Sequence, residues 1–345
     1  MRIISRTGVA AIAIVAASLL LAACGGSTGT SSASSSTSSS AVSSAASATG
    51  KKVILLTVSQ SCDYCATHTK AFQRVALAAG IEVKTVVNEF NAADQANQVT
   101  QAIAEKPDAI VLWPADATAI IPSLARIKAA NIPVIVTNSM PTTQDDSLFT
   151  AYTGPNDYNN GVSAAQAMIQ GFKAKSFGDA GNIIVVTGVP GTPPAIQRLK
   201  GITEELAKLA PGIKIVGTQP GGWDQTKATT ATAALLTQYR SDDIKGIYAQ
   251  ADNMLAGSLA ALKQAGLDPS KFVTVGSNCS IEGYNAIGAG TQYGTVLQSP
   301  IADGEAAANA VIKALEGQTQ EKTQYIPAEV ITKANLSDCA AAVGK

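Results

Sequence analysis

The chain has 345 residues, a formal net charge of +0 and 14% charged residues. It has no basic stripe and no acidic tail, which argues against nucleic acid as a partner. The length suits two lobes of ordinary size, and the 5% aromatic content beside abundant Ala and Gly indicates a globular α/β protein.

The N-terminus has the layout of a bacterial signal peptide. Arginines precede an apolar run over residues 9–23, which is too short to span a bilayer stably. The run ends in Leu21-Ala22-Ala23-Cys24-Gly25, which resembles the lipobox, where a peptidase cuts before the cysteine and its thiol is diacylated. We therefore expect residues 1–23 to be removed and Cys24 to be lipidated. An ordinary signal peptide with an accidental cysteine is the alternative.

Residues 24–50 are nearly all Ser, Thr, Ala and Gly, a composition that cannot bury enough apolar surface to fold. We expect a flexible tether here. Two acyl chains anchor a protein stably, so the folded part should lie at the outer face of the cell membrane. In an oxidising compartment the four remaining cysteines can form disulfides, with three pairings open: Cys62, Cys65, Cys279 and Cys339.

Short β-rich runs alternate with helical patterns along the rest of the chain. Strands are expected over residues 53–59, 83–87, 109–112, 134–137, 182–187, 213–218, 246–249, 272–276 and 294–298. Helices are expected over residues 64–79, 94–104, 120–130, 158–172, 194–209, 227–239, 254–265 and 302–315. Runs such as Ile183-Ile184-Val185-Val186 are apolar on both faces, which is typical of a parallel sheet covered by helices on both sides.

The chain also contains an internal repeat. A strand, Asp116, a helix and a second strand lead to Asn138, and the same order through Asp252 leads to Asn278. The repeat predicts two doubly wound parallel-sheet lobes, with ligand groups at the C-terminal ends of the strands and a cleft between the lobes. Each repeated Asp lies between a strand and a helix, so an N-cap is its first interpretation and a ligand contact the second.

Five stretches, in unbroken order, carry a family resemblance. They are Val53-Ile54-Leu55-Leu56-Thr57-Val58-Ser59, Lys106-Pro107-Asp108-Ala109-Ile110-Val111, Ile132-Pro133-Val134-Ile135-Val136, Gly191-Thr192-Pro193-Pro194-Ala195 with Arg198 and Gly201, and Ala249-Gln250-Ala251-Asp252-Asn253-Met254. Together they resemble the type I periplasmic binding proteins of the ribose, galactose and xylose group. The resemblance implies a monomeric solute-binding protein of an ABC importer, without enzymatic activity or cofactor, which captures a sugar or a similar small polar ligand and docks on a membrane permease.

The resemblance also implies how the lobes are divided. One lobe would hold residues 51–152 and 299–324, and the other residues 153–298 and 325–345. Three hinge segments would join them, with crossings near residues 153–155, near residues 276–279 or just after, and near residues 298–301.

By similarity, the ligand groups should follow the strand ends, as amide, carboxylate and aromatic side chains suited to sugar hydroxyls and C–H faces. They are Ser59, Gln60, Asp63, Trp113, Asn138, Ser139, Trp223, Asp252, Asn278 and Gln298. Ile196 stands where the family has an arginine, and Asn138 and Ser139 replace an Asp-Arg pair, so the pocket should be less charged and ribose itself is not expected. Arg198, inside a helix, is expected to be a surface charge, and the two tryptophans have core packing as their alternative.

Cys62 and Cys65 follow a strand and open a helix, where a thioredoxin-like motif would stand. A thiol-disulfide oxidoreductase is therefore an alternative function, as is a ligand sensor for a membrane receptor. His68 adds a third metal ligand, but structural zinc wants four, so no metal is expected. The favoured interpretation is a local disulfide at the cleft mouth, with Cys279 and Cys339 tying the C-terminal tail to a hinge strand. A single histidine rules out most His-based triads, and no phosphate-loop signature is present.

Overall fold

The computed structural model describes residues 47–239 and 244–343, within a compact unit that spans Ala45–Lys345. The expected signal peptide, the lipidation site Cys24 and most of the expected tether lie outside the described residues. Within the described residues, no helix is both long enough and apolar enough to cross a membrane.

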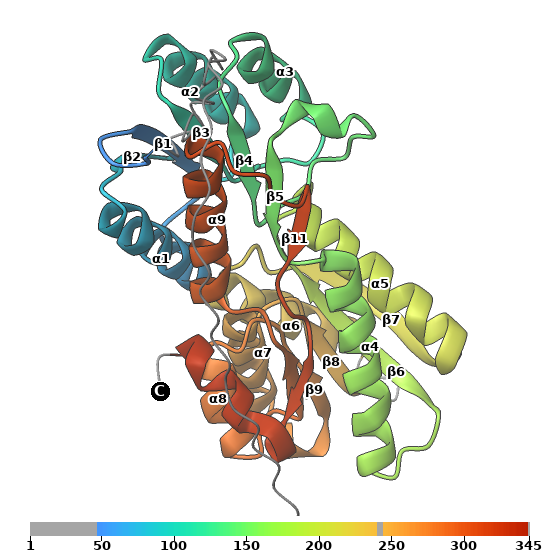
Figure 1. Cartoon of the computed structure of the whole chain (residues 1–345). Coiled ribbons are helices and arrows are strands. Elements are labelled where there is room, and N and C mark those ends of the chain that lie inside the picture. Colours follow the sequence, from blue (N-terminus) through green and yellow to red (C-terminus); the bar gives the residue numbers. More distant parts are fainter. Residues whose placement is uncertain (1–46, 240–243, 344–345) are drawn as a thin grey trace, which may run out of the picture. The chain divides into compact units, whose positions relative to one another are not determined.

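The first lobe is built on a six-stranded sheet with the order β11-β5-β4-β3-β1-β2, in which every pairing is parallel (Figure 1). Its strands are β1 (Lys52–Thr57), β2 (Glu82–Val87), β3 (Ala109–Leu112), β4 (Val134–Thr137), β5 (Ala151–Gly154) and β11 (Thr323–Tyr325). Helices α1 (Asp63–Ala78) and α9 (Pro300–Leu315) cover one face, and α2 (Ala92–Ala104) and α3 (Ile121–Ala129) cover the other. Buried apolar residues on both faces of β1 and β3 hold these layers together.

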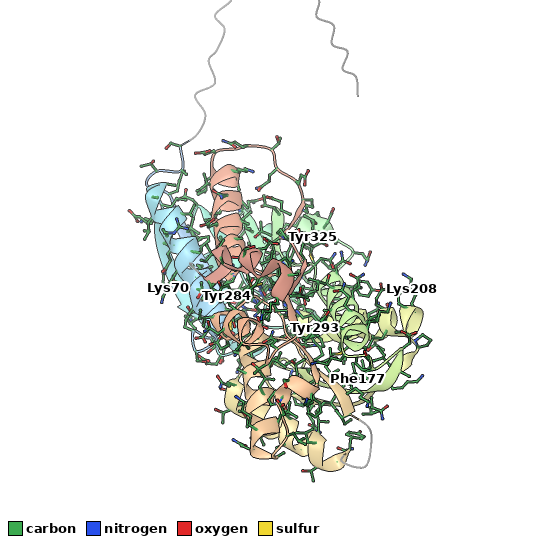
Figure 2. The ribbon with its side chains drawn as sticks, turned by 90° about the horizontal axis from the view of Figure 1, so that it is seen from below. Lys70, Phe177, Lys208, Tyr284, Tyr293 and Tyr325 are labelled. Carbon is green, nitrogen blue, oxygen red and sulfur yellow. A yellow bond between two sulfur atoms is a disulfide. The ribbon has the colours of Figure 1, made fainter. Side chains whose placement is uncertain are left out.

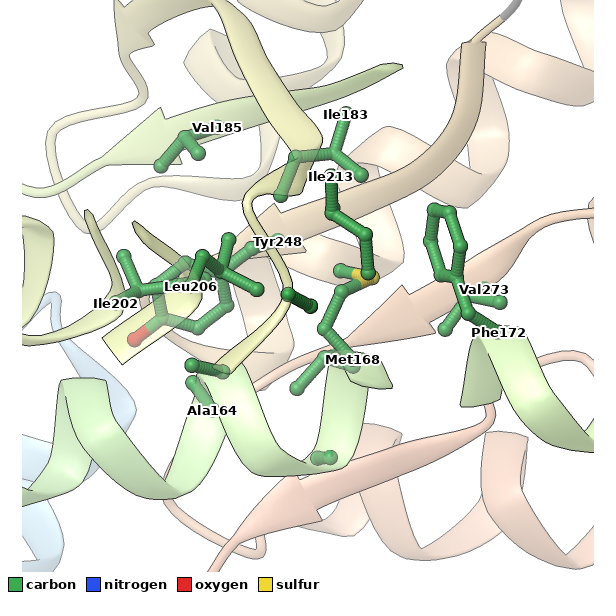
Figure 3. Packing of buried hydrophobic residues seen from close by; sticks show 14 of the residues in the cluster. Ala164, Met168, Phe172, Ile183, Val185, Ile202, Leu206, Ile213, Tyr248 and Val273 are labelled. Carbon is green, nitrogen blue, oxygen red and sulfur yellow. The ribbon is translucent and has the colours of Figure 1, made fainter. Parts of the chain in front are cut away.

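The second lobe repeats this plan with the order β12-β10-β9-β8-β6-β7. Its strands are β6 (Ala180–Thr187), β7 (Gly212–Pro220), β8 (Ile244–Ala249), β9 (Val273–Val275), β10 (Gly294–Val296) and β12 (Val330–Thr332), of which only β12 pairs antiparallel. Its helices are α4 (Asp157–Ala174), α5 (Pro193–Leu209), α6 (Gln225–Gln238), α7 (Asp252–Gln264) and α8 (Ile281–Gly288). In one core layer, Met168 and Phe172 of α4 pack toward Ile183 of β6 and Val273 of β9 (Figure 3).

Polar side chains lie on the outer faces of the helices. Lys208, near the end of α5, is exposed and points away from the core (Figure 2). This inside-outside division matches the helical periodicity of the sequence and confirms the expected α/β class with two parallel-dominated sheets.

The chain passes between the two sheets after β5, after β10 and after β11. The crossing expected near residues 276–279 is wrong, because β9, α8 and β10 all stay with the second sheet. At the first crossing Gly154 has φ +146, and a Cβ there would lie 2.8 Å from the backbone of Asn138, so only glycine fits. The hydroxyl of Tyr152 lies 2.9 Å from the Asn138 carbonyl oxygen and 2.7 Å from that of Pro155, which fixes the start of this hinge segment.

Candidate functional site

A cavity of about 520 Å³ lies between the lobes, within the size range of small-molecule sites. Its lining residues follow β1, β2, β3 and β4 of the first sheet and β6, β7, β8, β9 and β10 of the second. The C-terminal edges of the two sheets therefore face one another across the cavity, which is where ligands of doubly wound folds bind.

Seven of the ten side chains expected to bind the ligand line this cavity. They are Asp63, Trp113, Asn138, Ser139, Trp223, Asn278 and Gln298. Ser59 and Gln60 do not, because both fold back on their own loop. The Ser59 hydroxyl lies 2.8 Å from that of Ser61, and the Gln60 amide donates to the Val58 carbonyl at 2.7 Å.

Asp252 is the third expected ligand residue that does not line the cavity. Its carboxylate is fully buried and accepts hydrogen bonds from the Ser280 amide at 3.0 Å, the Gln292 side chain at 2.8 Å and the Thr295 hydroxyl at 2.9 Å. Burial raises the pKa of Asp252 to about 7. It is the first residue of α7, not its N-cap, and it supports the loop that carries Asn278 to the cavity. Asp116 caps instead the turn before α3, through the amides of Thr118 and Ala119.

Asn138 and Asn278 occupy equivalent places after β4 and β9, as the internal repeat predicts. Both have positive φ, +60 and +101, a conformation that asparagine tolerates better than most residues. The two left-handed turns direct both side chains to the cavity, one from each lobe.

An aromatic group forms the wall contributed by the first lobe. Trp113 is buried, and its ring centroid lies 4.8 Å from that of His68 and 6.1 Å from that of Tyr64, with interplanar angles of 64° and 88°. Gln95 fixes the tryptophan's loop, because its amide donates to the Trp113 carbonyl and its oxygen accepts from the Ala115 amide. The indole is thus held in one orientation against the cavity.

Asp303, in the first turn of α9, lies behind this wall and was not anticipated from the sequence. It accepts hydrogen bonds from the Tyr64 hydroxyl at 2.9 Å and the Asn138 amide at 2.7 Å, and burial raises its pKa to about 7. His68 lies 3.9 Å from the same carboxyl group, but burial lowers the histidine pKa to about 3, so it is neutral and bonds to the Thr137 hydroxyl. The carboxyl group therefore orients two cavity side chains, Tyr64 and Asn138.

Arg198 is buried and lines the cavity, so the expectation of a surface charge is wrong. Its guanidinium donates to Asp157 at 3.0 and 2.9 Å, to Gln298 at 2.6 Å, to the Gln250 carbonyl at 2.7 Å and to Asn278 at 3.4 Å. All five N–H groups have a protein partner. Burial raises the pKa of Asp157 to about 6 while Arg198 opposes the shift, so the pair is ionised at neutral pH.

A sequence signal for Arg198 was present. Buried positions of α5 recur at residues 194, 195, 198, 201, 202 and 206, the three- and four-residue spacing of a helix face packed on the core. An arginine on that face needs a buried acidic partner, and Asp157 at the start of α4 supplies it.

Trp223 forms the wall contributed by the second lobe. It has φ +62, and its ring packs against Gly188, where a Cβ would stand only 1.9 Å from the indole Cζ2. The Asn253 amide donates to the Trp223 carbonyl at 2.9 Å, and the Arg198 guanidinium lies 5.7 Å from the ring centroid. A glycine, a strained turn and an amide thus hold this ring in the cavity.

Both cysteine pairs lie at disulfide distance. The Cα atoms of Cys62 and Cys65 are 5.2 Å apart, and those of Cys279 and Cys339 are 5.5 Å apart. Cys62 and Cys65 line the cavity at the start of α1. Among the described residues, no group of three or more His, Cys, Asp or Glu side chains is arranged to hold a metal ion.

Comparison with known proteins gives a consistent result. A family model described as "Periplasmic binding protein domain" matches residues 53–319. A xylitol-binding protein of Mycolicibacterium smegmatis is 30% identical over 83% of this chain and 78% of its own length, and a putative rhizopine-binding protein of Rhizobium meliloti is 29% identical over 75% and 81%. The solved arabinose-transporter binding protein of Shewanella sp. ANA-3, bound to L-arabinofuranose, superposes with a TM-score of 0.76 at 25% identity over 83% of this chain and 93% of that one.

Proposed function

Because this chain belongs to the periplasmic binding protein domain family, we propose that it is the solute-binding protein of an ABC importer and captures an uncharged sugar or polyol between its lobes. The observation that carries the proposal is the cavity itself, in which amide and aromatic side chains from the strand ends of both sheets converge. The relatives named for xylitol and rhizopine, and the neighbour bound to arabinofuranose, support this ligand class.

The buried ion pair at the cavity supports an uncharged ligand. Arg198, the buried cation at the cavity, is neutralised by Asp157, and its five N–H groups are engaged within the protein. An anionic ligand would have to displace one of these bonds in a low-dielectric site, which is unfavourable. The amides of Asn138, Asn278 and Gln298 instead suit hydroxyl groups, and Trp113 and Trp223 suit C–H faces.

Binding would proceed by closure of the lobes. A ligand that contacts Asn138 on one side and Asn278 on the other gains its full set of hydrogen bonds only when the lobes approach, and this differential affinity favours the closed form. We further propose that Cys24 carries the lipid anchor, that the tether over residues 24–50 holds a monomeric protein at the outer face of the membrane, and that the closed form delivers its ligand to a permease.

A thermal-shift screen of sugars, polyols and sugar acids, followed by calorimetry on the hits, tests this proposal. We expect saturable binding of neutral polyhydroxy compounds and weaker binding of the matching sugar acids. The matched variants are Asn278→Ala, which removes a cavity amide, and Asn131→Ala, which removes an amide in a loop outside the cavity. A screen in which no polyhydroxy compound shifts the melting temperature would refute the proposal.

The redox alternative has one supporting observation, since Cys62 is the N-cap of α1, a place that lowers a thiol pKa. Against it, Cys65 is buried and packs with Trp113 and Val58 in the cavity wall, so only the half-buried Cys62 is accessible to a protein substrate. An insulin-reduction assay separates the two functions. We expect no turnover above that of the Cys62→Ser and Cys65→Ser double variant.

A further inference from the structure

The C-terminal segment of the chain reaches the ligand cavity. After β12, the 3-10 helices η3 (Lys333–Cys339) and η4 (Ala341–Val343) lead back toward the interlobe space, and Ala342 and Val343 join its lining. Helix η3 contacts α8, and η4 contacts α9. In Figure 1 this segment, in red, lies beside α8.

Several restraints hold the segment there. The pair Cys279 and Cys339, at disulfide distance, connects it to the residue that follows the cavity amide Asn278. Thr332 and Asn335 form a capping box at the start of η3, and Ala342 packs in a small core with both cysteines. Because the tail is attached to a loop that lines the cavity, Val343 has a fixed place in the cavity wall.

The cavity lining that includes this tail is rich in aliphatic side chains. Ile281 begins α8, Pro300 and Ile301 begin α9, and Ala342 and Val343 end η4, so five aliphatic residues form this part of the lining. The neighbouring Ser280 and Glu282 side chains are hydrogen bonded to each other. We call these five residues the aliphatic wall.

We propose that the aliphatic wall determines specificity, and that the preferred ligand is a neutral sugar or polyol bearing an alkyl substituent, such as the methyl group of a deoxy-sugar or an O-methyl group. This inference rests on the proposed function of the same cavity. A hydroxyl group placed against Ile281, Ile301 and Val343 would exchange water for a surface without hydrogen-bonding partners, whereas a methyl group gains from the same burial. A cavity of about 520 Å³ has room for a polar ring and such a substituent.

The test compares matched ligand pairs by calorimetry on the full mature protein: L-rhamnose with L-mannose, D-fucose with D-galactose, and O-methyl-inositol with myo-inositol. A methyl group in a hydrophobic pocket is worth about tenfold or more in affinity. In at least one pair we therefore expect the alkylated member to bind about tenfold more tightly. Val343→Asp should reduce this ratio to near one, and Val343→Leu, which stays aliphatic, should preserve it.

Leu267→Asp serves as the surface control, because Leu267 is 40% exposed and outside the cavity, and it should leave both affinities and their ratio unchanged. If Val343→Asp does not fold, Ile281→Asp gives the same readout from a side chain that is 42% exposed. Equal binding of both members of every pair would overturn the role of the aliphatic wall in specificity. An affinity ratio that persists in both Asp variants would overturn it as well. Either result leaves the proposed function standing. Absence of binding by every sugar and polyol overturns the proposed function instead.

Discussion

The Nη2 atom of Arg198 lies 2.6 Å from the side-chain oxygen of Gln298 beneath the ligand cavity. The Asn160 amide donates to the same oxygen at 3.2 Å, so the carbonyl end of Gln298 is held from two sides. Its NH2 group is directed to the hydroxyl of Tyr64, another residue of the cavity lining. The buried ion pair between Arg198 and Asp157 thereby sets the orientation of the Gln298 side chain, which lies at the second hinge crossing.

This orientation predicts the effect of Gln298→Glu. The new carboxylate still accepts from Arg198, but the Tyr64 hydroxyl at the cavity loses its donor and the cavity gains a negative charge. We expect calorimetry to show weaker binding by about 1–3 kcal/mol, the range for a lost hydrogen bond in a buried site. Gln318→Glu, on the exposed turn after α9, is the control and should bind as the parent does. Unchanged affinity in Gln298→Glu would place this amide outside the ligand contacts.

Removal of the arginine should act mainly on stability. Arg198→Met leaves the Asp157 carboxylate buried at the start of α4 without its cation, and breaking one side of a buried pair costs about 3–5 kcal/mol. Urea unfolding followed by circular dichroism measures this loss. The double variant Arg198→Met and Asp157→Leu removes both charges and should recover much of it. A loss below about 1 kcal/mol in the single variant contradicts the assigned pair.

How far the sequence predicts this architecture depends on whether the residues of an element carry the signal for it themselves. The nine expected strands were found in place because each is a run of β-branched or aliphatic residues. Strands β5, β11 and β12 were missed because they gain their order from neighbouring strands, a context that propensity does not contain. Helix α8 was missed for the same reason. Length is not the reason, since β9 and β10 also have only three residues and were predicted.

The residues of the candidate site were likewise predictable from the sequence only in part. Residues directly after a strand, such as Trp113 and Asn138, were predicted because strand ends converge in this fold. Asp303 and Arg198 lie on helices, where only packing against other elements brings Arg198 to the cavity and Asp303 behind its wall. Ala342 and Val343 are short apolar residues near the chain end, and nothing in their type indicates a ligand wall.

The two tryptophans of the chain, Trp113 and Trp223, both line the cavity, so intrinsic fluorescence should report ligand binding. Gly188→Ala places a Cβ 1.9 Å from the Trp223 ring and should displace it. We expect affinity to fall about tenfold or more, by analogy with the loss of a well-packed aromatic contact. In a Trp113→Phe background, Trp223 alone reports ligand binding. In this background we expect Gly188→Ala to give a smaller fluorescence change on ligand binding than the protein with Gly188.

Gly288→Ala is the matched control for this variant. Gly288 lies at the end of α8 with ordinary φ, and an added Cβ meets nothing closer than 3.8 Å. Its binding and fluorescence should equal those of the parent protein. If Gly188→Ala also leaves the fluorescence response intact, the indole of Trp223 does not form the cavity wall.

The buried carboxyl groups predict a pH dependence of stability. The pKa of Asp303 is raised from 3.8 to about 7, chiefly by burial, so the folded protein favours the protonated form. The stability from this preference is fully present below about pH 4 and is lost as the pH rises through about 7, an effect of up to about 4 kcal/mol. Asp157 and Asp252, with pKa values raised to about 6 and about 7, act in the same window and direction.

Asp303→Asn keeps an oxygen to accept from Tyr64 and Asn138 but cannot ionise. Its melting temperature should therefore fall less between pH 5 and pH 8 than that of the parent, while a slope from the other two buried carboxyl groups remains. Asp338→Asn, at an exposed position of η3, should keep the parent's profile. The pH dependence of stability requires that the folded and unfolded states bind different numbers of protons. If the melting temperatures of Asp303→Asn and the parent change in parallel with pH, Asp303 ionises as readily in the folded chain as in the unfolded one, which contradicts the prediction.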